Sequence, residues 1–231
     1  MPGSFDVYLE CGSKRLFAGA IEWPGWCRSA KTEAGALEAL VAYGPRYAAV
    51  LSASPGEGGG PDFQPPTEPS ALRVIERLKG GGGTDFGVPS EAPSGDEADL
   101  DASEVQRQAD ILGACWAALD RAAAAAEGVV LRTGPRGGGR DLHKILGHVL
   151  EADQAYLGQL GSRPPKGDGS PAHVKAQREA AVAAFTARAL GRPIPDPRQT
   201  KRPWTPRYFL RRAAWHVLDH AWEIEDRATP G

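Results

Sequence analysis

Trp204-Thr-Pro-Arg-Tyr-Phe-Leu-Arg-Arg-Ala-Ala-Trp-His-Val-Leu-Asp-His-Ala-Trp-Glu-Ile-Glu-Asp-Arg227 is the stretch that decides the fold of this 231-residue chain. Its small and apolar residues recur at the spacing of the buried face of an amphipathic helix. The pattern predicts a helix from about Pro206 to Arg227 that packs on other helices through one stripe. The stripe consists of Leu210, Ala213, Ala214, Val217, Ala221 and Ile224.

Three further segments with helical spacing precede this one. Ser103 and Gln106 have the spacing of a capping box for the first, and Asp141 can cap the second. Gly128 is expected to end the first helix, because glycine readily adopts the left-handed conformation that follows many helices. Four amphipathic helices with connections of mixed length predict an up-and-down-type four-helix bundle over 101–231.

The N-terminal part has a different pattern. Residues 5–10 and 15–23 are strand-like, and a Pro-Gly break follows them. Apolar residues at helical spacing then predict a helix over roughly 33–52, with Pro45 as an interruption. Together these elements predict a small α/β unit.

Two segments between the α/β unit and the bundle are less regular. Residues 72–79 mix apolar and charged side chains and fit neither period clearly, and residues 84–100 have the composition of a linker. The predicted fold class is α+β, with a small α/β domain over 1–83, a linker over 84–100 and the four-helix bundle over 101–231.

A histidine pair on the predicted last helix is the main indication of function. His216 and His220 are four positions apart, so their side chains share one face of the helix. His148, on the second helix of the bundle, can supply a third ligand. Three neutral imidazoles with one open position form a reactive coordination set for Zn²⁺, Fe²⁺ or Ni²⁺. The other two of the five histidines, His143 and His173, are predicted to lie on the surface.

The helical part, about 101–228, resembles the DinB-like superfamily. The resemblance is closest in His148-Val-Leu-Glu-Ala-Asp153 and in the segment from Trp215 to Arg227. It implies a four-helix bundle that holds a metal through one histidine of the second helix and a pair on the last, positions matched by His148, His216 and His220. Members include metal-dependent thiol-S-transferases and isomerases that use mycothiol or bacillithiol, which adds a low-molecular-weight thiol as a candidate cofactor.

The order strand, strand, turn and helix in the N-terminal part loosely resembles HicB-like domains, with Trp23-Pro-Gly-Trp-Cys27 before the helix. This resemblance implies a fold more than an activity. An appended α/β domain departs from the DinB-like pattern and leaves the substrate open.

Three residues are candidates for the chemistry around the metal. Glu223 lies one turn beyond His220, where a carboxylate can accept a proton from a metal-bound nucleophile or hold a ligand histidine in place. Arg212 lies one turn before His216, where a guanidinium can bind a substrate carboxylate or form a surface ion pair. Tyr156, on the same helix as His148, is the second candidate for substrate binding.

Charge and composition limit the classes of partner that the chain is expected to bind. The net charge is −2, with 10 Lys and Arg against 19 Asp and Glu in residues 1–130, and 17 against 10 in residues 131–231. The two halves can therefore attract each other, or the basic half can attract anionic ligands. No nucleic-acid partner is predicted, because the chain is slightly acidic and lacks a recognised nucleic-acid-binding motif. The absence of a signal core, a long apolar run and a Cys-x-x-Cys pair predicts a cytoplasmic protein with no membrane partner.

Two classes of function follow. The first is a metal-dependent enzyme that activates a thiol or water for transfer, isomerisation or hydrolysis of a small substrate, anionic if Arg212 takes part. The second is a non-catalytic binding or interaction protein with the bundle as scaffold, in which the HicB-like segment contacts a partner or a second copy in a homodimer. An antitoxin-like regulator is a weaker third reading.

Overall fold

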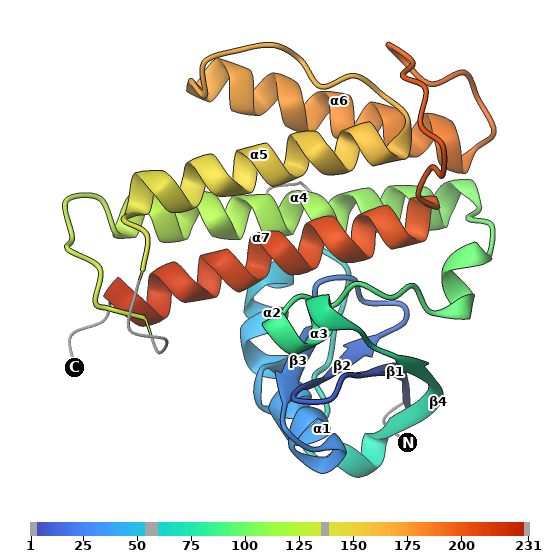
Figure 1. The fold of residues 1–231 in the computed structure, drawn as a ribbon, viewed down its shortest axis with the longest axis vertical. Helices are drawn as coiled ribbons and strands as arrows, with labels where there is room; N and C mark the ends of the chain where they lie inside the picture. Colours follow the sequence, from blue (N-terminus) through green and yellow to red (C-terminus); the bar gives the residue numbers. More distant parts are fainter. Residues whose placement is uncertain (1–3, 54–59, 135–138, 229–231) are drawn as a thin grey trace.

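The computed structural model describes residues 4–53, 60–134 and 139–228. Four long helices run side by side over a small sheet with its own helices, as Figure 1 shows. This confirms the predicted α+β class, an N-terminal α/β part followed by a four-helix bundle. The long helices are α4 (Ala102–Ala125), α5 (Leu142–Leu160), α6 (Pro171–Ala189) and α7 (Pro206–Ala228).

The ends of the bundle helices follow local sequence signals. Asp141 caps α5 by accepting a hydrogen bond from the Lys144 amide at 2.9 Å, as predicted. The capping box of α4 is formed by Asp101 and Glu104, so the prediction of Ser103 with Gln106 was wrong by two residues. The Asp101 carboxylate accepts hydrogen bonds from the backbone amides of Ser103 and Glu104. A carboxylate that pairs with two amides is a more effective helix cap here than the hydroxyl group of Ser103.

The sheet has four strands in the order β3-β2-β1-β4. The strands are β1 (Phe5–Cys11), β2 (Leu16–Ala20), β3 (Cys27–Ala30) and β4 (Leu72–Lys79). Strands β1, β2 and β3 are antiparallel neighbours, whereas β4 pairs parallel with β1. A parallel pair needs a long crossover, and the helices α1 (Glu33–Ala42) and α2 (Gly44–Ser52) lie within it.

Three local expectations are refined. The helix predicted over 33–52 is divided at Tyr43, because Pro45 opens α2 in the first turn where proline is tolerated. The second predicted strand ends at Ala20, and the residues after it lead into β3, which has no clear sequence signal. The undecided segment 72–79 is β4, an edge strand whose alternate charged side chains face solvent.

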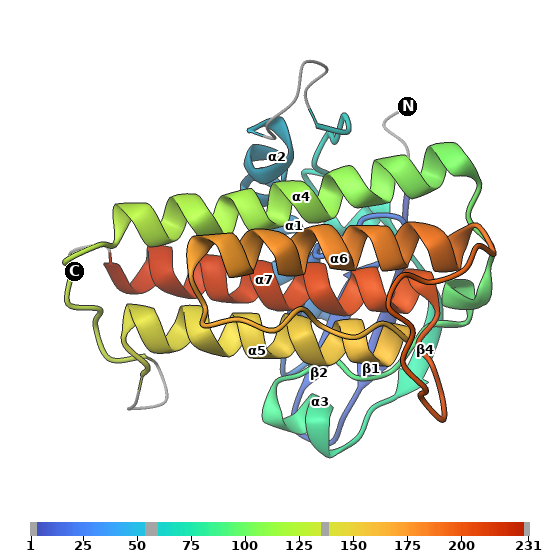
Figure 2. The same cartoon turned by 90° about the horizontal axis from the view of Figure 1, so that it is seen from above.

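Helix α7 lies at the centre of the molecule. In Figure 1 it runs between the sheet part and the other long helices, and Figure 2 shows it among α4, α5 and α6 from above. Its buried residues therefore occupy nearly the whole circumference rather than one stripe, and they include Arg211 and Arg212. Arg212, for which a surface ion pair was one of two expectations, is thus enclosed together with Arg211, because the N-terminal part covers the second face of the helix.

Residues 84–100, the segment predicted as a linker, lie along the face of α7 that the N-terminal part covers. This segment contains the end of α3 (Gly82–Phe86) and the short 3-10 helix η2 (Ser94–Glu97), while a second 3-10 helix, η1 (Pro69–Ala71), precedes β4. The fully buried carboxylate of Glu10 accepts hydrogen bonds from Thr84 Oγ1 at 2.5 Å and from the amides of Ser90 and Glu91. One continuous cluster of buried apolar residues extends through both parts of the chain. Among the described residues, no helix is both long and apolar enough to cross a membrane.

Candidate metal centre

Helices α5 and α7 bring the three predicted histidines together. His148 projects from α5, while His216 and His220 come from successive turns of α7. One ring nitrogen from each residue lies within 4.8 Å of the others. Helix α5 contributes a partly exposed ring and α7 contributes two buried ones, so the cluster lies near the surface between two packed helices. The three histidines are therefore close enough to bind one metal ion.

The separation of the nitrogens matches a shared ligand sphere. Nε2 of His148 lies 3.2 Å from Nε2 of His216. Two nitrogens bound tetrahedrally to one Zn²⁺, each about 2.0–2.1 Å from the ion, lie roughly 3.3 Å apart. The ring of His220 has its centroid 5.1 Å from that of His148 and 4.7 Å from that of His216. All three pairs of rings are thus at comparable distances.

His220 is oriented by a carboxylate on its own helix. Its Nδ1 donates to Glu223 Oε2 at 2.8 Å, which leaves Nε2 for a metal. The second oxygen of Glu223 accepts from Arg227 at 2.7 Å, and Arg227 also donates to the carbonyl groups of Arg132 and Arg140. The hydrogen bond from His220 is the largest influence on Glu223 and lowers the pKa of its carboxyl group. Metal-ligating histidines usually have such a carboxylate partner.

Two of the three rings, His216 and His148, favour the neutral form, which is the form that can coordinate a metal. Burial, with smaller contributions from the neighbouring His220 and His148 rings, lowers the pKa of His216 to about 2. Burial also lowers the pKa of His148, with an added contribution from the charge of Arg140. Nδ1 of His216 is buried with no hydrogen-bond partner among the described residues, so this ring has no second contact of the kind that Glu223 gives His220.

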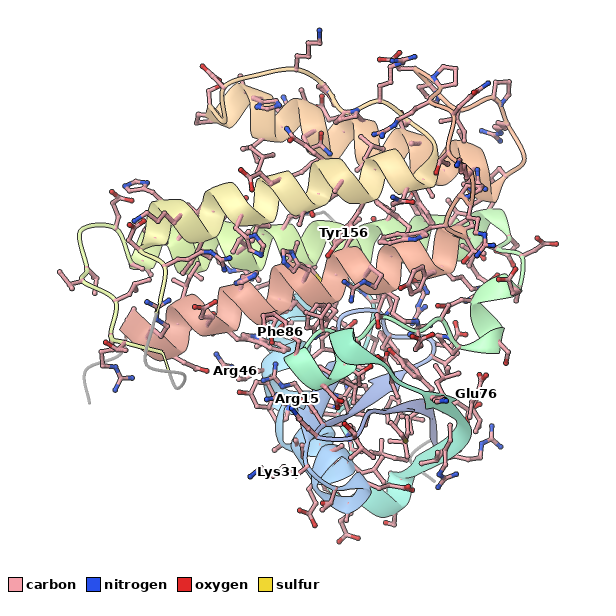
Figure 3. The ribbon with its side chains drawn as sticks, viewed as in Figure 1. Arg15, Lys31, Arg46, Glu76, Phe86 and Tyr156 are labelled. Atoms are coloured by element: carbon pink, nitrogen blue, oxygen red, sulfur yellow. The ribbon has the colours of Figure 1, made fainter. Side chains whose placement is uncertain are left out.

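Tyr156 and Arg212 lie beside the cluster. The Tyr156 ring centroid is 5.8 Å from that of His216, and Figure 3 shows Tyr156 on the side of α5 that faces α7. Arg212 donates to the Tyr156 hydroxyl at 3.2 Å and to the Pro89 carbonyl. Burial raises the pKa of Tyr156, which keeps its hydroxyl protonated. A positive charge and a phenol therefore stand next to His216, with the guanidinium held by two neighbours.

The sequence did not single out two aromatic residues on this side. Trp204 packs on Tyr156 with ring centroids 5.2 Å apart, and Tyr208 packs on Trp204 at 4.8 Å. Tyr208 also donates to the Ser90 carbonyl at 2.6 Å, which joins the aromatic group to the segment before α4. The only available signal was the aromatic-rich start of the last helix.

The two remaining histidines lie outside the cluster. His143 is exposed on α5, as predicted. His173 is buried, so its predicted exposure was wrong. Its Nδ1 accepts from the Gly169 amide at 2.9 Å, and its Nε2 lies 3.1 Å from the Pro165 carbonyl, so the ring fastens the loop before α6.

No family model, no curated protein and no solved structure matches this chain.

Proposed function

We propose that the chain is a metal-dependent enzyme of DinB-like type. His148, His216 and His220 hold one divalent cation, with Zn²⁺, Fe²⁺ and Ni²⁺ all compatible with three imidazoles. The observation that carries the proposal is the approach of three ring nitrogens from two helices to within 4.8 Å.

The chemistry follows from an incomplete ligand sphere. Three protein ligands leave a fourth position, where a divalent cation lowers the pKa of a thiol or water and supplies a nucleophile at neutral pH. The DinB-like resemblance favours a low-molecular-weight thiol of the mycothiol or bacillithiol kind. The proposed reactions are transfer, isomerisation or hydrolysis of a small electrophilic substrate.

Three side chains around the metal centre have different roles. Both oxygens of Glu223 are engaged, by His220 and Arg227, so its contacts favour the positioning of a ligand ring over proton abstraction. Tyr156 can donate a hydrogen bond to a substrate oxygen beside His216. Arg212 supplies positive charge at the same place, which favours an anionic substrate.

Metal content after purification tests the proposal directly. We expect near one equivalent of bound metal by elemental analysis of the full chain from metal-supplemented cells. The double variant His216→Ala/His220→Ala should lose the metal, whereas His143→Ala, an exposed histidine on the same helix as His148, should retain it. Metal content near zero in the unaltered chain, or unchanged content in the double variant, would refute the site.

Cobalt substitution then tests the chemistry. A Co²⁺-loaded chain should show the visible absorption of a tetrahedral site, and addition of a low-molecular-weight thiol should add a sulfur-to-cobalt charge-transfer band. A site that binds cobalt but never changes its spectrum with thiols or small anions would favour the alternative, a non-catalytic protein with a structural metal. Recovery of one stable protein partner with all three histidines dispensable would favour that alternative further.

A further inference from the structure

A second candidate site lies on the other side of α5. A cavity of about 650 Å³ is enclosed by α4, α5 and α6. Asp153, which lines it, is about 140° round α5 from His148 at roughly 100° per residue, so the cavity and the histidine cluster use different faces of one helix. Its volume is within the range of small-molecule sites. The apolar lining includes Leu119, Ala123, Leu146, Val149, Pro171 and Val174.

Two buried polar side chains in the wall of this cavity have atoms without a hydrogen-bond partner. Asp153 is 7% exposed and Gln177 is 1% exposed. Asp153 Oδ2 accepts from Trp116 Nε1 at 3.0 Å, but its Oδ1 has no hydrogen-bond partner. The side-chain nitrogen and oxygen of Gln177 both lack one as well. Nε of Arg178, which also lines the cavity, is a fourth buried atom without a partner. Buried polar groups are almost always paired, so four unpaired atoms around one cavity call for a ligand that pairs them.

Apart from Arg178 Nε, the charged groups of the cavity have partners. Arg178 donates to both oxygens of Asp120, at 2.6 and 2.8 Å, and Lys175 lies 3.8 Å from Glu179. What remains is a requirement for hydrogen bonds: a donor for Asp153 in its ionised form, which prevails above about pH 7, both a donor and an acceptor for Gln177, and an acceptor for Arg178 Nε. An ammonium group lacks the acceptor, and a carboxylate lacks the donors. A carboxamide has both.

We propose that the cavity between α4, α5 and α6 binds a small molecule with an apolar body and a carboxamide-type head. The N–H groups of the head donate to Asp153 and Gln177, its carbonyl accepts from Gln177, and the body packs on the apolar lining. This site is independent of the metal centre, because it uses none of the three histidines.

Heptanamide is a suitable probe, with heptanoate and heptylamine as matched molecules that differ only in the head. The indole N–H signal of Trp116 in ¹⁵N-labelled full-length chain reports on the site, because it donates to Asp153; Trp116→Phe assigns it. Heptanamide should shift this signal saturably, with affinity at least about tenfold above that of either matched molecule, because each of those leaves a buried group unpaired. Absence of saturation, or equal affinity for all three, overturns the proposal.

Two glycine variants locate the binding. A Cβ built at Gly147, which lines the cavity, meets no atom within 4 Å, and neither does one built at Gly113 on α4 outside it. Both helices should therefore accept leucine, which is a better helix former than glycine. Gly147→Leu should abolish the heptanamide shift and Gly113→Leu should preserve it. Retained binding in Gly147→Leu places the ligand elsewhere and overturns the proposal.

Two further measurements test whether Gln177 recognises the head group and whether binding is independent of the metal centre. Gln177→Leu should remove most of the preference for heptanamide, whereas Gln108→Leu, a change at a buried glutamine outside the cavity, should keep it. The whole titration is repeated with a chelator. Unchanged shifts support a site separate from the metal centre, and shifts that vanish with the metal overturn it.

Discussion

Arg211 on α7 and Asp96 in η2 form an ion pair, 2.5 Å between nitrogen and oxygen, with side-chain exposures of only 7% and 0%. The guanidinium also donates to the carbonyl groups of Ala20 and Ile21, at 2.7 and 3.1 Å. One side chain of the bundle thus holds the end of β2 and the segment before α4 together. Because α7 also carries two of the histidines, this contact joins the N-terminal part to the helix of the metal centre.

Loss of Asp96 should destabilise the whole chain. Asp96→Ala leaves the Arg211 charge buried without its counter-ion, and the free energy of unfolding should fall by about 3–5 kcal/mol. Urea unfolding followed by far-ultraviolet circular dichroism measures the change. Asp6→Ala is the control, since it breaks an ion pair with Arg73 that is largely exposed and should cost far less. Equal losses in the two variants would contradict the structural role of the buried pair.

The features that the sequence predicted are those carried by local patterns. Helix periodicity located the four long helices, and the Asp141 cap depends only on residues of the same turn. The i,i+4 spacing of His216 and His220 fixed their common face. The addition of His148 came from its place on a second helix, and the packing of α5 on α7 brings it to the pair.

The features that it missed depend on contacts between distant segments. Arg211 and Asp96 are separated by 115 positions, and no periodicity in either segment indicates the other. The burial of Arg212 follows from the covering of α7 by the N-terminal part, which a single apolar stripe does not foretell. Strand β4 was left undecided because Ile75 lies on the exposed face and Glu76 on the half-buried one, which breaks the alternation of apolar and charged residues.

Glu223 should control metal affinity through His220. Glu223→Ala removes the acceptor for Nδ1 and should weaken metal binding about 10- to 100-fold, the usual effect of losing such a partner. Glu223→Gln keeps an acceptor and should weaken binding less. Isothermal titration with Zn²⁺ measures both.

The matched control for Glu223 is on the same helix. Asp219 pairs with Arg28 at 3.2 Å and touches none of the three histidines, so Asp219→Asn should leave metal affinity unchanged. If the enzyme proves active, a positioning role also predicts that Glu223→Gln changes metal affinity without removing a limb of the pH–rate profile. Loss of a limb at full metal occupancy would instead indicate proton transfer by Glu223.

Asp153 should make stability depend on pH. Burial raises its pKa from 3.8 to about 7. The folded chain then holds a proton that the unfolded chain releases above about pH 4, so this contribution to stability is fully present below that pH and is lost as pH rises through about 7. The expected slope is at most about 1.4 kcal/mol per pH unit in that window.

Asp153→Asn isolates this contribution. An amide does not titrate, so in urea unfolding the stability of the variant relative to the original chain should increase from pH 5 to about pH 7 and level off above it. A control at the exposed Asp141, whose pKa is lowered by hydrogen bonds from Lys144, should show no such gain at high pH. A difference between Asp153→Asn and the original chain that stays constant with pH would show that the carboxyl group remains ionised throughout.

Metal binding should stabilise the fold by joining two helices. His148 belongs to α5 and the pair His216 and His220 to α7, so a metal bound to all three must be released when these helices separate. Zn²⁺ at about a hundred times its dissociation constant should raise the free energy of unfolding by roughly 3 kcal/mol over the value with a chelator.

His148→Ala leaves both remaining ligands on one helix and should remove most of this gain. The chelated variant should nevertheless unfold much like the original, because His148 is partly exposed. His143→Ala, at an exposed position of the same helix, should keep the full gain. Equal stabilisation of His148→Ala and the original chain by Zn²⁺ would mean that α5 takes no part in the metal centre.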